Sequence, residues 1–190
     1  MTSPVLHVIA GPNGAGKTTF VERVLAPSSL EFVNADRIAA ERWPDDPGEH
    51  AYQAAQMAEQ RREQLIQAHR SFVAETVFSH ESKVGLVRNA SRSGYIVVLH
   101  VVIVPEDFAV ARVEDRVSNG GHAVPEDKIR SRHRRLWGHV AAAVRIAGQS
   151  HVYDNTSAST PFRLVAHYRN GLLVRQSGWP AWAPPELVNL

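Results

Sequence analysis

The chain has no cysteine and very little net charge. Among its 190 residues, 21 Lys and Arg stand against 19 Asp and Glu, which gives a formal net charge of +2. The absence of thiols excludes disulfides, Cys-ligated zinc and thiol catalysis. So small a charge gives no electrostatic support for a nucleic-acid partner. The rest of the composition, with 44% hydrophobic and 21% charged residues, is that of an ordinary globular protein.

Long hydrophobic runs are missing as well. The longest apolar stretch, at 95–104, is about half as long as a membrane span. The first residues lack the charged and then apolar pattern of an export signal. We therefore expect no membrane partner and a cytoplasmic location. The length predicts a single domain over residues 1–190.

A glycine-rich loop follows an apolar run at 5–10 and precedes a helical pattern that opens at Thr19. The loop reads Gly11, Pro12, Asn13, Gly14, Ala15, Gly16, Lys17 and Thr18, a full G-x-x-x-x-G-K-[ST] motif. In such a loop the backbone N–H groups surround phosphates, Lys17 reaches the β- and γ-phosphates, and the Thr18 hydroxyl ligates Mg²⁺. The strand and helix around it argue against an ordinary Gly-rich turn. The sequence therefore predicts a site for a nucleoside triphosphate.

Apolar runs alternate with helical patterns along most of the chain, which favours an α/β fold with helices around a parallel sheet. We expect five parallel strands near 5–10, 31–34, 71–75, 95–104 and 150–154, and helices over about 47–70, 105–119 and 125–147. We expect His100, within the fourth strand, to be a hydrogen-bonded core residue. Residues 162–168 and 172–175 flank Asn170-Gly171 and predict a C-terminal β-hairpin. The core would span 5–156, a lid about 118–136, and the hairpin with the tail 157–190.

Two carboxylates lie at or just after the carboxyl ends of predicted strands, at the sheet edge where α/β proteins bind ligands. Asp36 is our candidate for the general base that accepts the proton of an acceptor hydroxyl and orients its oxygen. The alternative is that Asp36 only complements a helix dipole. Glu75 could hold water on Mg²⁺ or accept a hydrogen bond from the substrate, unless it is a structural carboxylate. Since no aliphatic strand ends in the usual metal-binding aspartate, we expect Asp36 and Glu75 to hold Mg²⁺ through water, while Thr18 ligates it directly.

Arginines supply the remaining candidates. Arg112 and Arg116 lie four residues apart on one helix face, where the first could stack on adenine and the second contact phosphate. Ion pairs with Glu114 or Asp115 are the alternative. The break at 119–122 is a candidate lid hinge. The next helix carries Lys128, Arg130, Arg132, Arg134 and Arg135. Some of these cations could close over a transferring phosphoryl group, and a basic solvated face is the alternative.

Taken in order, these segments resemble the zeta-toxin-like family of P-loop kinases. The segments are 11–18, 34–36, 72–76, 112–117, 120–125 and 152–155. The resemblance implies a P-loop kinase fold with the five-stranded sheet order 2-3-1-4-5 and ATP as the phosphoryl donor. It implies that Asp36 is the base, that Glu75 contacts the acceptor and that Arg116 contacts the phosphates.

Two positions depart from the family pattern. Better-known toxins carry a second lid arginine where this chain reads Gly120-Gly121-His122, so that role passes to a residue such as Arg132. The acceptor-site threonine is shifted by one position, to Thr76.

The function expected from these residues is Mg²⁺- and ATP-dependent phosphoryl transfer to a hydroxyl of a small molecule. Family members phosphorylate UDP-N-acetylglucosamine and are held inactive by an antitoxin protein, so the resemblance implies both as candidates. One alternative is an ATPase switch that acts on a protein partner. Another is a nucleic-acid-associated ATPase or polynucleotide kinase that uses the face at 128–135, although no aromatic-lined groove supports it.

Overall fold

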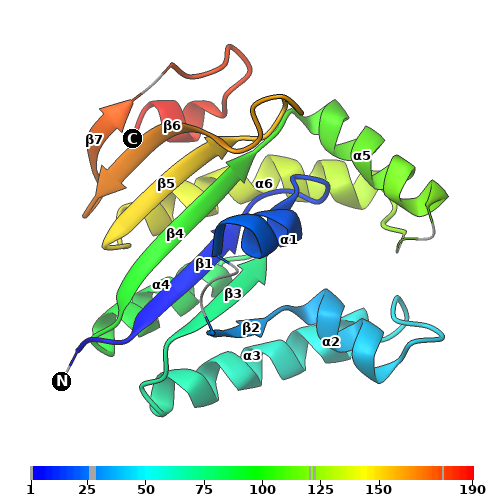
Figure 1. The fold of residues 1–190 in the computed structure, drawn as a ribbon, viewed down its shortest axis with the longest axis horizontal. Coiled ribbons are helices and arrows are strands. Elements are labelled where there is room, and N and C mark those ends of the chain that lie inside the picture. Colours follow the sequence, from blue (N-terminus) through cyan, green and yellow to red (C-terminus); the bar gives the residue numbers. More distant parts are fainter. Residues whose placement is uncertain (1, 26–28, 120, 122, 177) are drawn as a thin grey trace.

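The protein is built on one sheet of seven strands, with helices on both faces (Figure 1). The computed structural model describes residues 2–25, 29–119, 121, 123–176 and 178–190. The strand order is β2-β3-β1-β4-β5-β6-β7. The strands are β1 (Val5–Ala10), β2 (Glu31–Val33), β3 (Phe72–Thr76), β4 (Ile96–Ile103), β5 (Gln149–Asp154), β6 (Arg163–Arg169) and β7 (Leu172–Gln176).

The first five strands confirm the expected parallel core and its order, but the prediction of a five-stranded, wholly parallel sheet was wrong. β6 pairs antiparallel with β5, and β7 pairs antiparallel with β6, so the hairpin extends the same sheet and makes it mixed. The physical reason is that β5 would otherwise leave a row of backbone groups unpaired at the edge. Val165, Ala166 and Tyr168 of β6 are buried and extend the core.

The helices are α1 (Lys17–Phe20), α2 (Ala35–Arg42), α3 (Ala51–Gln67), α4 (Ser82–Arg92), α5 (Glu106–Ser118), α6 (Glu126–Val144) and α7 (Pro185–Val188), and a π-helix η1 (Val21–Leu25) continues α1. The helix expected over about 47–70 begins later than predicted, at Ala51, because residues 47–50 form turns in which Ala51 N donates to Gly48 O at 3.3 Å. None of the helices in the described part of the chain is long and apolar enough to cross a membrane.

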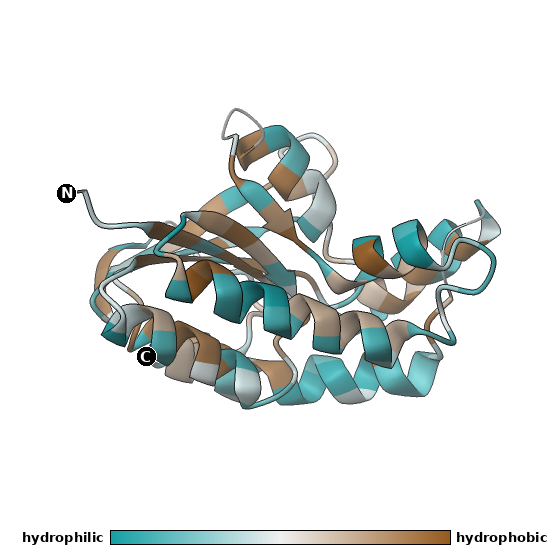
Figure 2. Cartoon of the chain, turned by 90° about the horizontal axis from the view of Figure 1, so that it is seen from below, coloured by the Kyte–Doolittle hydropathy of each residue, from teal (hydrophilic) through white to brown (hydrophobic). Residues whose placement is uncertain are grey.

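Each face of the sheet has its own core. Leu6, Val8 and Leu99 pack against α4 and α6 on one face, with α3 completing that layer. On the other face Phe20 of α1 packs against Ile9 and Val102. Figure 2 shows hydrophobic strands inside and hydrophilic turns along the outer sides of the long helices. The two-sided burial fixes the carboxyl ends of β1, β3 and β4 beside one another, and the site is built there.

A row of histidines crosses the sheet on the α1 face. The row consists of His7, His100, His151 and His167, on the adjacent strands β1, β4, β5 and β6. Successive ring centroids lie 5.3, 5.8 and 4.5 Å apart, and the rings are stacked. His100 is only 5% exposed. Its Nε2 lies 3.1 Å from Nδ1 of His7, whereas its own Nδ1 has no partner among the described residues, so only half of the expected hydrogen bonding is present there.

Candidate nucleotide and acceptor site

The glycine-rich loop connects β1 to α1 as the motif predicts. Gly14 and Gly16 have φ angles of 73° and 88°, a region that side chains other than glycine rarely adopt. A Cβ on Gly14 would lie 2.5 Å from the backbone oxygen of Ala109, and one on Gly16 would lie 2.6 Å from Nδ2 of Asn155. Both glycines are therefore required by conformation and by space. Such a loop presents successive N–H groups to an anion.

Asn155, just after β5, holds the loop in place. Its Nδ2 donates to Ala15 O at 2.9 Å, and its Oδ1 accepts from Phe162 N at 3.4 Å. The side chain is 6% exposed. Sequence reasoning assigned Asn155 no role of its own, although a polar residue directly after a buried strand was a usable signal. The hydrogen bond ties the phosphate loop to the far side of the parallel core.

Lys17 is the buried charge at the centre of the site. The residue is 7% exposed, and its Nζ donates to Pro12 O at 2.9 Å. Burial lowers the pKa of Lys17; Glu75 and Asp36 oppose this shift, while Arg116 and Arg132 add to it. All four of those side chains therefore act on Lys17 through short-range electrostatics. Residues from α1, α2, β3, α5 and α6 thus converge on one site.

Glu75 links the phosphate loop to the start of α2. Its Oε2 accepts from Thr18 Oγ1 at 3.0 Å and from Asn34 Nδ2 at 2.8 Å. Asn34 also caps α2, since its Oδ1 accepts from Asp36 N at 2.7 Å and from Arg37 N at 3.1 Å. One asparagine, not selected from the sequence, thereby positions both carboxylates.

The oxygen atoms of Thr18 and Glu75 suit a Mg²⁺ ion that is held together with nucleotide phosphates, and not a metal ion ligated by the protein alone. The Thr18 hydroxyl and the Glu75 carboxylate are adjacent hard donors, and Mg²⁺ commonly uses one or two protein oxygens with phosphates and water. Within the described ranges, no group of three or more His, Asp or Glu side chains is arranged to hold a metal ion. A bound Mg²⁺ would accordingly depend on nucleotide phosphates for most of its ligands.

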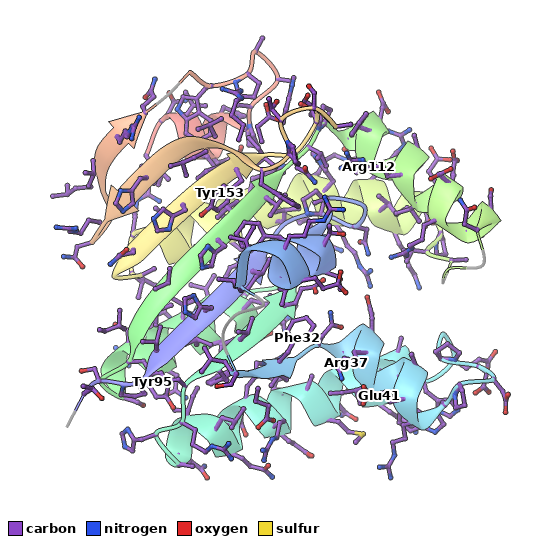
Figure 3. All side chains as sticks on the ribbon, in the orientation of Figure 1. Phe32, Arg37, Glu41, Tyr95, Arg112 and Tyr153 are labelled. Atoms are coloured by element: carbon purple, nitrogen blue, oxygen red, sulfur yellow. The ribbon has the colours of Figure 1, made fainter. Side chains whose placement is uncertain are left out.

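A cavity of about 550 Å³ opens beside Asp36, which is exposed in the first turn of α2. Its polar lining residues are Thr18, Glu22, Asn34, Asp36, Arg37 and Arg116, and its apolar ones are Val21, Leu25, Leu30, Phe32 and Val73. Figure 3 labels Phe32 on β2 and Arg37 on α2, the two elements that form one wall. The volume suits a small-molecule ligand. Thr76 is not among the lining residues, and its Oγ1 accepts from Phe78 N at 3.1 Å.

Arg112 lies beside the phosphate loop. Its guanidinium carbon is 4.4 Å from the ring centroid of Phe108, one turn earlier, and its Nη1 is 3.4 Å from Gly14 O. No ion pair with Glu114 or Asp115 is present in the part of the chain that the structure describes. Burial lowers the pKa of Arg112. The guanidinium thus lies over the ring of Phe108, and Figure 3 labels Arg112 on α5.

The five basic residues of α6 do not behave alike. Arg130 pairs with Glu106 at 3.0 Å, Asp107 at 2.7 Å and Glu126 at 2.8 Å, and Arg134 lies 3.7 Å from Glu106. These two therefore fix α6 to α5 instead of facing the phosphate loop. Lys128 and Arg135 are exposed, and Arg132 alone of the five acts electrostatically on Lys17. The candidate hinge includes Gly120 and His122, which lie outside the described residues, whereas Gly121 N donates to Arg116 O at 2.8 Å.

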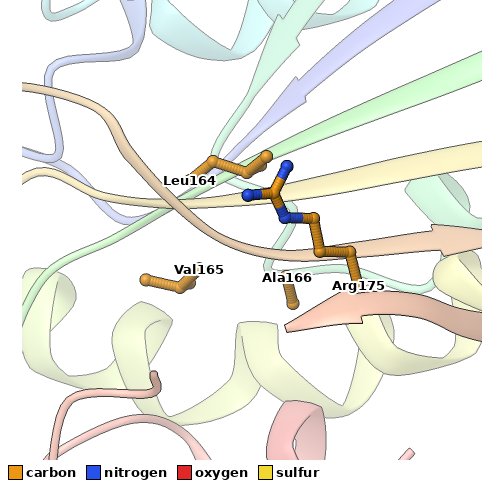
Figure 4. Close-up of a pocket in the computed structure, with 4 residues that line it drawn as sticks. All are labelled: Leu164, Val165, Ala166 and Arg175. Atoms are coloured by element: carbon orange, nitrogen blue, oxygen red, sulfur yellow. The ribbon is translucent and has the colours of Figure 1, made fainter. Parts of the chain in front are cut away.

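A second, smaller cavity lies between β6 and β7. It has a volume of about 250 Å³ and is lined by Leu164, Val165, Ala166 and Arg175 (Figure 4). None of its lining residues belongs to the phosphate loop or to the convergent charges. With three aliphatic side chains and a single arginine, it offers no acid or base for catalysis.

Solved structures of similar fold include several P-loop proteins. A complex of AvrRxo1-ORF1 and AvrRxo1-ORF2 with sulphate ions matches with a TM-score of 0.70 and 15% identity, over 90% of this chain and 60% of that chain. The PezAT toxin–antitoxin system of Streptococcus pneumoniae matches with a TM-score of 0.61 and 14% identity, over 88% and 72% of the two chains. Shikimate kinase from Acinetobacter baumannii matches with a TM-score of 0.53 and 16% identity, over 83% and 87%. These likenesses show the fold.

Sequence comparison gives two further matches. An uncharacterized protein of Haemophilus influenzae is 28% identical over 125 residues, which are 65% of this chain and 88% of that protein. The family described as AAA domain matches residues 6–159, from the second residue of β1 to beyond the end of β5. That range contains the phosphate loop and every convergent charge described above. The chain therefore belongs to the AAA-domain family of P-loop proteins, with a P-loop kinase-like α/β fold.

Proposed function

We propose that the protein is a Mg²⁺- and ATP-dependent kinase that transfers the γ-phosphoryl group to a hydroxyl of a small molecule. The observation that carries the proposal is the convergence of Asp36, Glu75, Arg116 and Arg132 on buried Lys17, beside a cavity of about 550 Å³. Phosphoryl transfer needs positive charge around the phosphates and a carboxylate near the attacking oxygen. The side chains around Lys17 supply the positive charge and the carboxylate, and the cavity leaves room for an acceptor.

In this proposal the loop N–H groups and Lys17 hold the β- and γ-phosphates. Asp36 accepts the proton of the acceptor hydroxyl as its oxygen forms a bond to the γ-phosphorus and the bond to the leaving oxygen of ADP breaks. Bound Mg²⁺ neutralises charge on the phosphates. Thr18 would ligate the ion directly, and Glu75, hydrogen-bonded to Thr18 at 3.0 Å, would hold it through water.

Arginines complete the proposed nucleotide site. Arg116 lines the cavity and Arg132 acts on Lys17, so both can stabilise negative charge on the transferring group. Arg112 would stack its free guanidinium face on adenine, because Phe108 already supports the other face. Thr76, whose Oγ1 accepts from Phe78 N at 3.1 Å, would contact the acceptor through its hydroxyl proton or its second lone pair.

UDP-N-acetylglucosamine is the first acceptor to test, because the ordered motifs resemble those of the zeta-toxin-like family. The structural likeness to a chain from a toxin–antitoxin system supports a second proposal, that a protein antitoxin binds this kinase. The chain spans 60% of the AvrRxo1 chain, so the activity and partners of that whole protein stay outside the proposal.

The test is a transfer assay with Mg²⁺-ATP and a panel of nucleotide sugars, including UDP-N-acetylglucosamine, and simple sugars, with products identified by mass spectrometry. We expect Asp36→Ala to lower turnover by about 10³-fold, the range of general-base catalysis, and to change ATP affinity by no more than a few-fold. Asp127→Ala is the matched control, since it removes an exposed aspartate from the first turn of α6.

Two results would contradict the proposal. If Asp36→Ala abolished ATP binding, Asp36 would be a structural residue of the nucleotide site and not the base. If ATP were hydrolysed steadily while every acceptor stayed unmodified, an ATPase switch acting on a protein partner would be the better assignment.

A further inference from the structure

The cavity beside Asp36 has an apolar lining that the transfer step itself does not use. This lining consists of Val21, Leu25, Leu30, Phe32 and Val73. Val73 is 2% exposed and belongs to the core on the α1 face of the sheet, whereas the other four are only partly buried against that core. Apolar side chains that keep contact with water forgo the free energy that full burial returns. A ligand with an apolar surface would complete their burial.

The strand register places two of these side chains beside the proposed acceptor site. Phe32 on β2 pairs with Val73 on β3, and each lies two residues before a polar residue of the site, Asn34 or Glu75. Residues two apart in an extended chain share one face of the sheet and lie about 7 Å from each other. Asn34 is itself extended, with φ of −134° and ψ of 127°. The apolar lining therefore begins one step back from the strand ends, on the same face.

The π-helix η1 contributes two more apolar side chains. It continues α1 directly, so its residues lead away from Thr18 and the phosphate loop. Its first and last residues, Val21 and Leu25, both line the cavity, whereas Val24 is 45% exposed and is not among the lining residues. Single π-helical turns are rare and are frequent at functional sites. The wall formed by η1 is thus apolar as well.

The ionisable groups of the lining carry no net charge. They are two carboxylates and two guanidinium groups, from Glu22, Asp36, Arg37 and Arg116. Arg37 is moreover paired with Glu41 at 2.6 Å. A strongly charged acceptor therefore finds no net opposite charge in the lining to offset its loss of hydration. An uncharged acceptor has no such cost.

We propose that the acceptor is an uncharged amphipathic alcohol, with its hydroxyl beside Asp36 and its aliphatic or aromatic body against Leu25, Phe32 and Val73. This inference rests on the proposed function, because it names the substrate class of that reaction. The hydroxyl proton passes to Asp36, the hydroxyl oxygen bonds to the γ-phosphorus and the bond to ADP breaks, while the apolar body only positions the molecule. A cavity of about 550 Å³ accommodates such a ligand.

The test compares two probes that share one polar head and differ only in their apolar tail, methyl β-D-glucoside and hexyl β-D-glucoside. The whole chain is used, with its phosphate loop filled by saturating Mg²⁺ and a non-hydrolysable ATP analogue. Titration followed by ligand-observed NMR gives the Kd of each probe. We expect the native protein to bind the hexyl probe at least about 10-fold more tightly, because each buried methylene adds favourable transfer free energy.

Variants locate the tail. Phe32→Gln and Leu25→Gln should reduce the preference for the hexyl probe to within about 3-fold, because both replace the apolar lining by an amide. Val24→Gln is the matched control, since it makes the same kind of change in the same turn but outside the cavity. Phe32→Leu keeps an apolar side chain and should retain most of the preference. Native-like affinity for the ATP analogue shows that each variant is folded.

Two results would overturn the inference. One is equal affinity of the native protein for the two probes. The other is a hexyl preference that survives undiminished in both Phe32→Gln and Leu25→Gln.

A transfer assay separates this inference from the kinase proposal. With Mg²⁺-ATP, the two glucosides are compared with UDP-N-acetylglucosamine, the charged candidate that the family resemblance suggests. Transfer to the nucleotide sugar by a protein without a tail preference would uphold the kinase and overturn the apolar acceptor. A tail preference without transfer to any acceptor would leave the apolar ligand site in place and contradict the kinase.

Discussion

The charged cleft, which consists of Lys17, Asp36, Glu75, Arg116 and Arg132, and the histidine row lie beside the same sheet. Acidic and basic side chains meet in the cleft, whereas the row consists of imidazoles alone. In the cleft, carboxylates and arginines surround Lys17, which remains 7% exposed. In the row, His100 is similarly buried at 5% exposure, but its neighbours are other imidazoles. Phe20 of α1 packs on His100, with ring centroids 5.2 Å apart, and so connects the two regions. Burial alone therefore does not decide whether a titratable group stays charged.

The neighbours explain the difference. Glu75 and Asp36 partly offset the burial of Lys17 by favouring its charged form. Burial, with contributions from His7 and His151, lowers the pKa of His100 to about 3. Burial also lowers the pKa values of His7 and His151 themselves. The surroundings of Lys17 therefore favour a charged group more than the surroundings of His7, His100 and His151 do.

The largest effect we expect comes from breaking the charged cleft. Lys17→Met should weaken ATP binding by about 10- to 10²-fold and abolish turnover, because a charge-assisted contact to phosphate contributes roughly 1.5–3 kcal/mol and Glu75 and Asp36 would lose a neighbouring positive charge. Calorimetric titration with ATP and Mg²⁺ measures this. Lys128→Met, on the exposed part of α6, is the control. Near-native ATP affinity in Lys17→Met would mean that the N–H groups of the loop are sufficient to bind the phosphates.

Unfolding at acid pH tests whether His100 is neutral in the folded protein. Because the pKa of His100 in the folded state lies near 3 and that of an unfolded histidine near 6.5, the unfolded chain binds more protons between these values. Stability should therefore fall as the pH drops from about 6.5 toward 3, by on the order of a few kcal/mol. Denaturant unfolding at several pH values measures the slope.

His100→Phe sharpens this test, since it keeps an aromatic ring and removes the proton site. We expect a shallower pH slope in this variant, whatever its absolute stability. His69→Asn is the control, because His69 is exposed and its φ of 49° suits asparagine. Identical slopes in all three proteins would assign the acid sensitivity to other groups.

The smallest effect concerns the edge of the cleft. Arg112→Lys keeps the charge but loses the planar surface that packs at 4.4 Å from Phe108. We expect KM for ATP to rise by about 3–10-fold, in line with a stacking contribution near 1 kcal/mol, with kcat nearly unchanged. Comparing ATP with GTP sharpens the measurement, because a stacking role should alter the preference between bases. An unchanged KM would leave Arg112 as a support for the Gly14 carbonyl only.

Local signals in the sequence were sufficient for the parallel core. Short buried strands, helix-opening prolines and the spacing of Gly11 to Thr18 each depend on a few consecutive residues, and the strand order followed from the family resemblance. The hairpin at 162–175 was predicted, but its pairing with β5 was not, because a turn motif fixes which two strands meet and says nothing about the third.

The site residues also divide into those with a local sequence signal and those whose partners are distant in the chain. Asp36, Glu75 and Arg116 could be chosen because each follows a strand or repeats at helical spacing. Asn34 and Asn155 were missed as positioning residues, since their partners Glu75 and Ala15 are distant in the chain. The five α6 cations looked equivalent in sequence, and only the packing of α5 against α6 commits Arg130 and Arg134 to Glu106.

The sequence by itself determined a phosphate loop, a parallel α/β core and the kinds of side chain available at its strand ends, because these depend on local conformation and periodicity. Tertiary structure alone decided which charges find partners. It paired Arg130 with carboxylates, placed charged side chains around Lys17 and stacked His100 among imidazoles. The physical reason is that electrostatic free energy depends on distance and burial in space, and neither is encoded by spacing along the chain.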